Sequence, residues 1–302
     1  MITKAHEIKA KNNVKILIYG SPGSGKTTMA VSADKTLLVD FDGGVHRVDP
    51  RHLVDTVQVT KLEDFIQLLD NEDLSMYDTL SIDTIGKMLD YAGDALIKSD
   101  PKLGRKDGAL TLQGYGARKA LFKTIIHRCD TLTKNIIFVA HDKEEKDGDY
   151  KSIRPEVGGS SAGDLIKELD LVGYLRSYTQ KRMLSFNPTD EWYGKNTANF
   201  PANIEFKKPE SENRFLQGII NQYRAEQNKR SVMITEYSML METIEGNLDT
   251  VIDADSMNEF IEWILKSEVI WDSKTRAGVM TMEKAKALNL TLNKTIKKYE
   301  TV

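Results

Sequence analysis

The sequence predicts an α/β fold, with a mostly parallel central sheet flanked by helices and a small, mainly helical C-terminal region. Two observations predict it. Short apolar segments rich in β-branched residues alternate with segments whose apolar residues recur at helical spacing. The chain is also 302 residues long, which exceeds the typical size of one domain and indicates a large core with a smaller appendage.

The alternation of strands and helices fills the first half of the chain. Residues 14–19 form an apolar run that ends in a glycine-rich turn, and a helix opening follows directly. The pattern predicts further strands at 36–41, 78–85 and 135–140 and helices at 61–70 and 115–133. The segment 135–140 is almost wholly apolar, which is typical of a central strand buried on both faces. Strands separated by helices predict parallel connections between them.

The pattern changes after residue 170. Two late strands are expected at 171–178 and 181–187, and prolines among polar residues then predict an extended segment over 188–213. A helix is expected at 214–227. These boundaries divide the chain into a core over 1–187, a loop-rich extension over 188–227 and a helical module over 228–302.

The C-terminal module carries helix signals but no recognisable chemistry. Ser256 and Glu259 have the spacing of a capping box. An apolar helical stripe accompanies them at Met257, Phe260, Ile261, Ile264 and Leu265. Residues 242–268 contain eight acidic residues and one lysine, which disfavours DNA binding there. An interaction or capping role is therefore the preferred interpretation.

Composition restricts the classes of function. The formal net charge is −3, so any binding of nucleic acid requires locally concentrated basic residues. The single cysteine, Cys129, forms no intramolecular disulfide, fits a reducing cytoplasm, and is best explained as a small residue on a helix face. The polar N-terminus, and the lack of an apolar run near the ~20 residues of a membrane span, predict a soluble, cytoplasmic protein.

The segment from Gly20 to Thr27 matches the phosphate-binding pattern GxxxxGKS/T at every fixed position, between a strand and a helix. Its glycines let backbone N–H groups turn toward phosphate oxygens, and the following helix adds its positive N-terminal end. Lys26 is expected to reach the β- and γ-phosphates, and Thr27 to ligate Mg²⁺. We therefore expect ATP and Mg²⁺ to bind here, with the nucleotide held by Gly20, Ser21, Pro22, Gly23, Ser24, Gly25, Lys26, Thr27 and Thr28.

Strand ends supply further candidates. Asp83 ends a predicted strand, where a carboxylate can hold magnesium directly or through water. Asp40 and Asp42 lie two residues apart on one face of another strand, so Asp42 is either a base for the attacking water or part of an ordinary Asp-Gly-Gly turn. His141 follows the strand at 135–140 and could contact the γ-phosphate, although a histidine at a strand end is more often simply exposed.

The order of these segments resembles the RecA-type ATPase core of homologous-recombination proteins. GSPGSGKT, VDFDGG, LSIDT, IFVAH and EVGGSSAGDLIKELD follow one another within residues 12–187. The chain is more closely similar to phage-encoded RecA-like single-strand annealing proteins, a nucleotide-binding family of the AAA type. The resemblance implies a RecA-like fold, phosphate binding by Lys26, and magnesium binding by Thr27 and Asp83.

The same resemblance assigns catalysis to Lys26, Asp42 and His141. Asp42 is the counterpart of a catalytic glutamate, and His141 is the counterpart of a polar sensor of the γ-phosphate. Because Asp is one methylene shorter than Glu, hydrolysis is expected to be slow. The implied protein is a slow ATPase that single-stranded DNA stimulates.

Two segments match the chain positions at which RecA-like proteins bind single-stranded DNA. The first, 98–118, is rich in glycine and contains Lys102, Arg105 and Lys106. The second, 142–163, follows the sensor strand and contains Lys143, Lys151 and Arg154. Residues 94–128 hold eight Lys and Arg against three Asp, and positive charge on a flexible loop suits phosphate contacts. Solvated, mobile loops are the alternative for both segments.

The resemblance also implies a homo-oligomer, either a filament or a ring, with ATP between subunits, and it makes a single-strand-binding protein a candidate partner. No arginine stands out beside these motifs in the sequence. The cation for the γ-phosphate is therefore expected from a neighbouring subunit, among Arg182, Lys195, Lys207 and Lys208. Two other classes stay open: a motor-type RecA-fold ATPase related to helicases, and a P-loop metabolite kinase.

Overall fold

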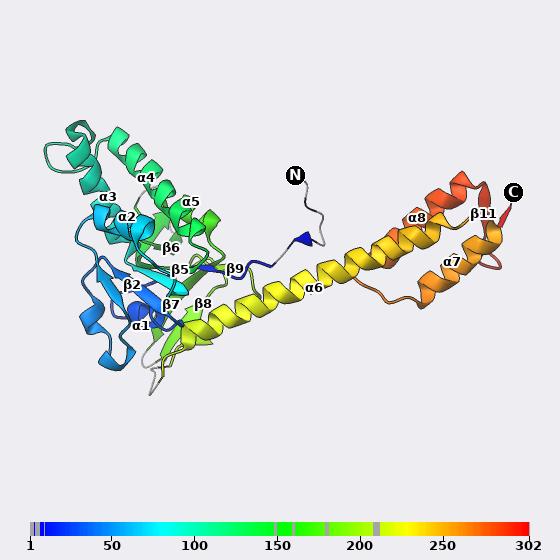
Figure 1. The fold of residues 1–302 in the computed structure, drawn as a ribbon, viewed down its shortest axis with the longest axis horizontal. Helices are drawn as coiled ribbons and strands as arrows, with labels where there is room; N and C mark the ends of the chain where they lie inside the picture. The colour runs from blue at the N-terminus through cyan, green and yellow to red at the C-terminus, as the bar shows by residue number, and fades with distance from the viewer. Residues whose placement is uncertain are drawn as a thin grey trace. The chain divides into compact units, whose positions relative to one another are not determined.

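The computed structural model describes residues 3, 7–8, 10–147, 150–158, 161–178, 181–207 and 212–301. The chain divides into two compact units (Figure 1). Residues 11–224 form the larger unit, and residues 1–10 together with 225–302 form the smaller one. The larger unit contains the P-loop and the strand-end motifs.

One ten-stranded sheet forms the centre of the larger unit. Its main path runs β10-β8-β7-β1-β5-β4-β2-β3, with β6 paired to β5 and β9 paired to β7. The strands are β1 Lys15–Gly20, β2 Thr36–Asp40, β3 Thr56–Gln58, β4 Thr79–Asp83, β5 Asn135–Asp147, β6 Tyr150–Pro155, β7 Leu171–Tyr178, β8 Lys181–Ser185, β9 Lys195–Asn196 and β10 Ile204–Glu205. The neighbours from β7 through β1, β5, β4 and β2 to β3 all run parallel, which confirms the expected α/β architecture.

Helices cover both faces of this sheet (Figure 1). They are α1 Lys26–Ala30, α2 Leu62–Asn71, α3 Ile85–Ser99, α4 Leu112–Thr131, α5 Ser161–Glu168 and the start of α6 Phe215–Asp249, with short 3-10 helices at Val45–Arg47, Pro50–His52 and Pro101–Leu103. Side chains of β1 alternate between the faces. Leu17 and Tyr19 pack with α2, α3, α4 and α5, whereas Ile16 and Ile18 pack with α1 and α6.

Cys129 lies in the first of these cores, on the buried side of α4, and is 1% exposed. Burial raises the pKa of its thiol to about 12. The expectation that this cysteine fills a helix face is therefore confirmed, because a thiol with so high a pKa is a weak nucleophile at neutral pH.

The smaller unit is mainly helical. Besides the rest of α6, it contains α7 Ala254–Lys266, α8 Ser273–Ala287 and a hairpin of β11 Leu290–Asn293 with β12 Lys298–Thr301. The sequence pattern did not predict this hairpin. Among the described residues, no helix of either unit has the length and apolar character that crossing a membrane requires.

The capping box of α7 lies one turn earlier than expected. Asp253 is the N-cap residue, and its carboxylate accepts a hydrogen bond from the Ser256 backbone N–H at 2.9 Å. Ser256 thus occupies the third helical position rather than the cap, so the expected pairing with Glu259 was wrong. The apolar stripe is also narrower than expected, since Leu265 is 67% exposed while Phe260 is buried.

Three segments differ from the expected local structure. The helix expected at 214–227 continues to Asp249. The segment 142–163 is largely a hairpin, in which the end of β5 pairs with β6 from Asp142 opposite Pro155 onward, rather than a mobile loop. The segment 98–118 is an ordered connection, in which Gly104 and Leu110 form a β-bridge between the ends of α3 and α4. Backbone pairing holds residues 142–147 and 150–155 in the hairpin, and the Gly104–Leu110 bridge holds the connection.

Candidate nucleotide-binding site

The phosphate-binding segment joins the end of β1 to the start of α1. Gly23 and Gly25 have φ angles of 76° and 98°, a left-handed conformation that residues with a Cβ rarely adopt. At Gly20 the reason is different, because a Cβ there would collide with the carbonyl oxygen of Leu175 on β7. The loop therefore needs glycine at these positions to keep its shape beside the neighbouring strand.

Lys26 folds back over the loop that precedes it. Its Nζ donates hydrogen bonds to the carbonyl oxygens of Gly20 at 2.8 Å and Ser21 at 2.9 Å, and the side chain is buried. Burial lowers the pKa of Lys26, and the charges of Asp83 and Asp142 partly offset this effect. A phosphate group against the ammonium would supply the negative charge that a buried cation needs.

Thr27 and Asp83 form the candidate magnesium site. The Thr27 hydroxyl donates a hydrogen bond to Oδ2 of Asp83 at 2.6 Å. Asp83 ends β4 and is buried, and this burial raises its pKa. Hydroxyl and carboxylate oxygens are ligands that suit Mg²⁺, so these two residues fit the metal that the P-loop implies. When bound, Mg²⁺ supplies positive charge to the phosphate oxygens.

The carboxylates of Asp40 and Asp42 have different surroundings. Asp40 is 2% exposed and accepts backbone hydrogen bonds from Asp42 at 3.1 Å, Gly44 at 3.2 Å and Val45 at 3.0 Å. These bonds hold the turn that follows β2. Asp42 is exposed, and its Oδ2 lies 3.6 Å from Nη1 of Arg47. Of the two, Asp42 has the carboxylate oxygens available to orient a water molecule.

His141 and Asp142 lie beside the P-loop. The pairing of β1 with β5 sets Gly20 opposite His141, and Nδ1 of His141 is buried without a hydrogen-bond partner in the described part of the chain. Asp142 was not among the residues predicted for the site, and its carboxylate accepts a hydrogen bond from Ser21 Oγ at 2.9 Å. The sequence did place Asp142 directly after His141, at the same sheet edge, and this position could have indicated that it belongs to the site.

One cavity of about 250 Å³ collects these side chains beside the P-loop. The sequence-predicted residues that line it include Lys26, Thr27, Thr28, Asp42, Asp83 and His141. Arg47 and Arg182 of the same chain line it as well. The sequence did not indicate that these two arginines of the same chain line the site. The turn after β2 places Arg47 there, and β8 places Arg182 there, although it is distant in sequence.

The other candidate cations have different surroundings. Lys195 donates hydrogen bonds from its Nζ to the carbonyl oxygens of Leu169 at 2.5 Å and Ile166 at 3.3 Å, and so closes the end of α5. Lys207 is exposed, and Lys208 lies outside the described residues. Lys195 therefore has a structural partner in its own subunit.

The candidate DNA-binding residues fall into two groups. Lys102, Arg105 and Lys106 are exposed, at the connection between α3 and α4. The hairpin group, Lys143, Lys151 and Arg154, lies on β5 and β6. There the charges are paired: Lys143 contacts Glu145 at 2.6 Å, Lys151 contacts Glu144 at 3.2 Å, and Arg154 lies 4.0 Å from Glu145.

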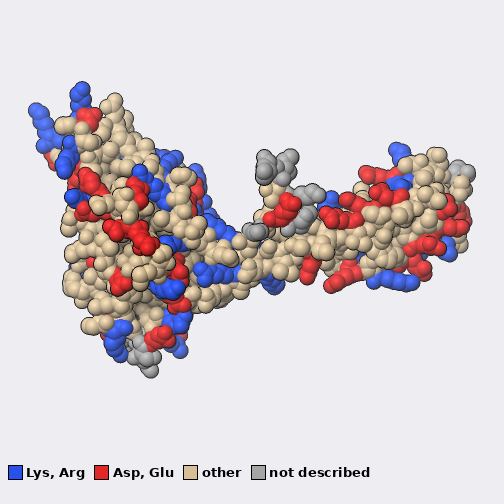
Figure 2. Space-filling view, in the orientation of Figure 1, with Lys and Arg blue, Asp and Glu red and all other residues tan. Residues whose placement is uncertain are grey.

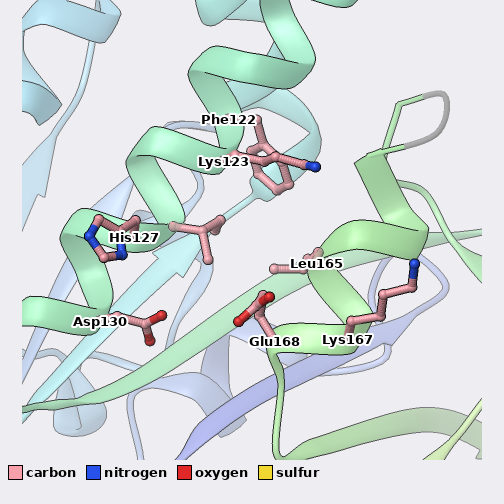
Figure 3. A pocket seen from close by; sticks show the side chains of 8 residues that line it. Phe122, Lys123, His127, Asp130, Leu165, Lys167 and Glu168 are labelled. Carbon is pink, nitrogen blue, oxygen red and sulfur yellow. The ribbon is translucent and has the colours of Figure 1, made fainter.

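A separate cavity of about 400 Å³ lies between α4 and α5 (Figure 3). Phe122 and Ile126 of α4 and Leu165 of α5 give it an apolar lining, and charged side chains such as Asp130 and Glu168 stand at its edge. It contains none of the motif residues, so it does not belong to the nucleotide site.

The P-loop, the buried carboxylate at the end of β4 and the parallel sheet define a P-loop nucleotide-binding ATPase fold. A family model described as an AAA domain matches residues 12–198, more than half of the 302 residues, and the chain belongs to this family. Among solved structures, the flagellar accessory protein FlaH from Methanocaldococcus jannaschii is similar at 13% identity and a TM-score of 0.37, over 68% of this chain and 88% of that chain. No curated protein matches.

Proposed function

We propose that this AAA-domain protein is a recombination or strand-annealing protein of the phage type. In this proposal it hydrolyses ATP slowly, binds single-stranded DNA and forms a homo-oligomer. The observation that carries the ATPase part is the single cavity that Lys26, Thr27, Asp83 and Asp42 share. The DNA part rests on exposed basic side chains at one end of the α3–α4 pair.

In the proposed hydrolysis, each residue has one task. Lys26 and the loop N–H groups bind the phosphates, and Thr27 and Asp83 hold the magnesium ion. Asp42 orients a water molecule for attack on the γ-phosphate and takes its proton, while the bond from the γ-phosphorus to the bridging oxygen breaks and ADP and inorganic phosphate are released. His141, opposite Gly20 on the adjacent strand, contacts the γ-phosphate with an imidazole N–H. Its buried Nδ1 has no hydrogen-bond partner among the described residues, which supports this role because a buried polar atom without a partner is costly.

The basic end of the α3–α4 pair supports the DNA proposal. Figure 2 shows Lys and Arg side chains gathered at this end of the larger unit. Lys102, Arg105 and Lys106 are exposed there. The neighbouring acids are engaged with the backbone, since Asp100 accepts from the Lys102 N–H at 3.0 Å and Asp107 from the Ala109 N–H at 3.1 Å. Because Lys102, Arg105 and Lys106 are exposed, their charges are accessible to a phosphate from solvent.

The β5–β6 hairpin has a weaker electrostatic case, because its cations pair with Glu144 and Glu145. Its location supports a different contribution. The hairpin begins at Asp142, whose carboxylate accepts a hydrogen bond from the P-loop residue Ser21. A hairpin attached to the nucleotide loop can respond to the bound nucleotide, so we propose that it links DNA contact to hydrolysis.

A salt titration of binding to fluorescent single-stranded DNA tests the DNA proposal. Replacing Lys102, Arg105 and Lys106 together with Ala is expected to weaken binding to all sequences and to flatten the salt slope by up to about 0.7 per lost contact. The matched control replaces Lys294, Lys297 and Lys298, three exposed lysines of the smaller unit, with Ala. If DNA affinity changes neither with salt nor on replacing Lys102, Arg105 and Lys106, the end of the α3–α4 pair is not part of the DNA-binding site.

A measurement of ATP turnover separates the alternative classes. Single-stranded DNA should raise the turnover, whereas a panel of small hydroxyl acceptors should leave it unchanged and yield no phosphorylated product. Phosphorylation of an acceptor would instead favour a metabolite kinase. Fast, ring-dependent turnover with strand separation would favour the motor class.

A further inference from the structure

The guanidinium of Arg182 lies over the P-loop of its own chain. A Cβ built on Gly25 would lie 2.8 Å from Nη1, 3.2 Å from Cζ and 3.5 Å from Nε of Arg182. The same side chain lines the cavity that contains Lys26 and Thr27. This arginine therefore faces the phosphate-binding loop at the residue that directly precedes the P-loop lysine.

The sheet topology explains this placement. The strand β7 runs parallel to β1, and β8 returns antiparallel to β7. The start of β8 consequently lies at the sheet edge where β1 ends and the P-loop begins. Arg182 is opposite Ser177 in this pairing, and its carbonyl oxygen accepts a hydrogen bond from the Phe206 N–H at 2.8 Å. Backbone pairing on both sides of β8 thus fixes the position from which the arginine reaches the loop.

The charge of Arg182 is not used elsewhere in the described part of the chain. No carboxylate there forms an ion pair with it, and it is half-buried. Arg47, the other arginine of the cavity, differs because it lies 3.6 Å from the Asp42 carboxylate. A guanidinium that covers a phosphate-binding loop without an acidic partner has the geometry and the charge to accept an anionic ligand.

We propose that Arg182 binds the α- and β-phosphates of the nucleotide held in its own subunit. The inference rests on the proposed nucleotide binding, and it assigns Arg182 to its own subunit and to the α- and β-phosphates, whereas the sequence suggested that Arg182 acts on the γ-phosphate of a neighbouring subunit. The P-loop backbone around Gly25 contacts the α- and β-phosphates. Arg182 approaches the same place from β8, so its planar fork and the loop N–H groups hold those phosphates from two sides.

Equilibrium binding of ADP and ATP, measured by titration calorimetry on protein shown to be monomeric, tests this assignment. Arg182→Ala is expected to weaken the binding of ADP and of ATP by a similar factor, about 10- to 100-fold, which corresponds to the loss of a charge-assisted hydrogen bond. Arg182→Lys should lose less nucleotide affinity than Arg182→Ala, because lysine keeps the positive charge. It should still bind more weakly than the wild type, because lysine lacks the planar fork of the guanidinium. Lys181→Ala, which removes the exposed neighbouring cation, is the matched control and should bind both normally.

The outcomes separate this inference from the proposed function. Wild-type protein that binds neither nucleotide would contradict the nucleotide site itself. Normal binding of both nucleotides by Arg182→Ala, with wild-type binding intact, would overturn the Arg182 assignment alone. Loss of ATP affinity with unchanged ADP affinity would also overturn it, because the arginine would then act on the γ-phosphate. Circular dichroism and melting of both Arg182 variants show whether each is folded.

A mixing experiment distinguishes the same subunit from a neighbour. Arg182→Ala keeps Lys26, and Lys26→Ala keeps Arg182. If Arg182 acts within its own subunit, a mixture of the two variants regains no ATP binding or turnover beyond the sum of its parts. Recovery on mixing would show that the arginine reaches a neighbour's nucleotide and would overturn the proposal.

Discussion

The Ser21 hydroxyl donates a hydrogen bond to the Asp142 carboxylate at 2.9 Å and so joins the P-loop to the first residue of the β5–β6 hairpin. The same carboxylate oxygen accepts from the Tyr174 hydroxyl at 3.4 Å. The pairing of β1 with β5, which sets Gly20 opposite His141, brings the two ends together. A change in the P-loop on nucleotide binding therefore has a direct contact through which it reaches the hairpin.

This contact predicts that Asp142→Ala reduces the coupling between DNA and ATP hydrolysis. Removing the acceptor frees Ser21, so the ratio of DNA-stimulated to basal ATP turnover should fall toward one. Asp142→Asn, which keeps one acceptor oxygen, should lose less. Steady-state phosphate release with and without single-stranded DNA measures the ratio. A full stimulation ratio in Asp142→Ala would exclude this contact from the coupling.

Lys26→Ala should abolish binding of ATP while the chain stays folded. Within the described part of the chain, the ammonium donates hydrogen bonds only to the carbonyl oxygens of Gly20 and Ser21, so its loss leaves the apolar cores unchanged. Titration with ATP and a thermal melt of the ligand-free protein measure the two effects. Unchanged ATP affinity in this variant would contradict the central assignment of the P-loop.

Asp42→Asn and Asp40→Asn should fail in different ways. Asp42→Asn is expected to bind ATP but not hydrolyse it, because an amide cannot take the proton of the attacking water. Asp40→Asn should instead lose about 1–3 kcal/mol of stability, since an amide has one acceptor oxygen for the three backbone N–H groups that Asp40 serves. Single-turnover hydrolysis and denaturant unfolding test the pair. Normal hydrolysis of ATP by Asp42→Asn would show that Asp42 is not the base.

Asp83→Asn should stabilise the ligand-free protein and abolish the additional stabilisation by magnesium. Burial raises the pKa of Asp83 in the folded chain above its unfolded value, so folding favours the protonated carboxyl. The stability that protonation of Asp83 contributes is fully present below the pKa of this carboxyl in the unfolded chain. It is lost as the pH rises through the pKa in the folded chain. Burial in the folded chain thus penalises the ionised form of Asp83, and Asn removes this penalty.

The expected rise in Tm for Asp83→Asn at pH 7 is about 2–4 °C, the shift that about 1 kcal/mol produces in a unit of this size. The advantage over wild type should shrink toward acidic pH, where the wild-type carboxyl is protonated. Melting curves from acidic to neutral pH, with and without Mg²⁺ and ADP, measure both effects. A lower Tm at neutral pH without ligand would show that Asp83 stabilises the empty site.

The sequence by itself determined the P-loop, the end of β4 at Asp83 and the position of His141 directly after the apolar part of β5, although β5 continues beyond His141 to Asp147. These signals are local, because the phosphate pattern and the apolar strands around it each lie within a short segment. The alternation of these strands with helices also predicted that the strands run parallel, and therefore that their C-terminal ends lie at one edge of the sheet. The C-terminal hairpin β11–β12 gave no comparable signal, since its strands are short and mostly polar.

The tertiary structure decided which polar groups are free and which distant residues reach the loop. The sequence places Asp40 and Asp42 on one face, but only the folded turn shows that Asp40 is engaged by three backbone N–H groups. Likewise, the place of β8 beside β7 depends on strand order, which brings Arg182 within contact of Gly25. Hydrogen-bond competition and strand order are properties of the whole sheet, and a local pattern therefore does not contain them.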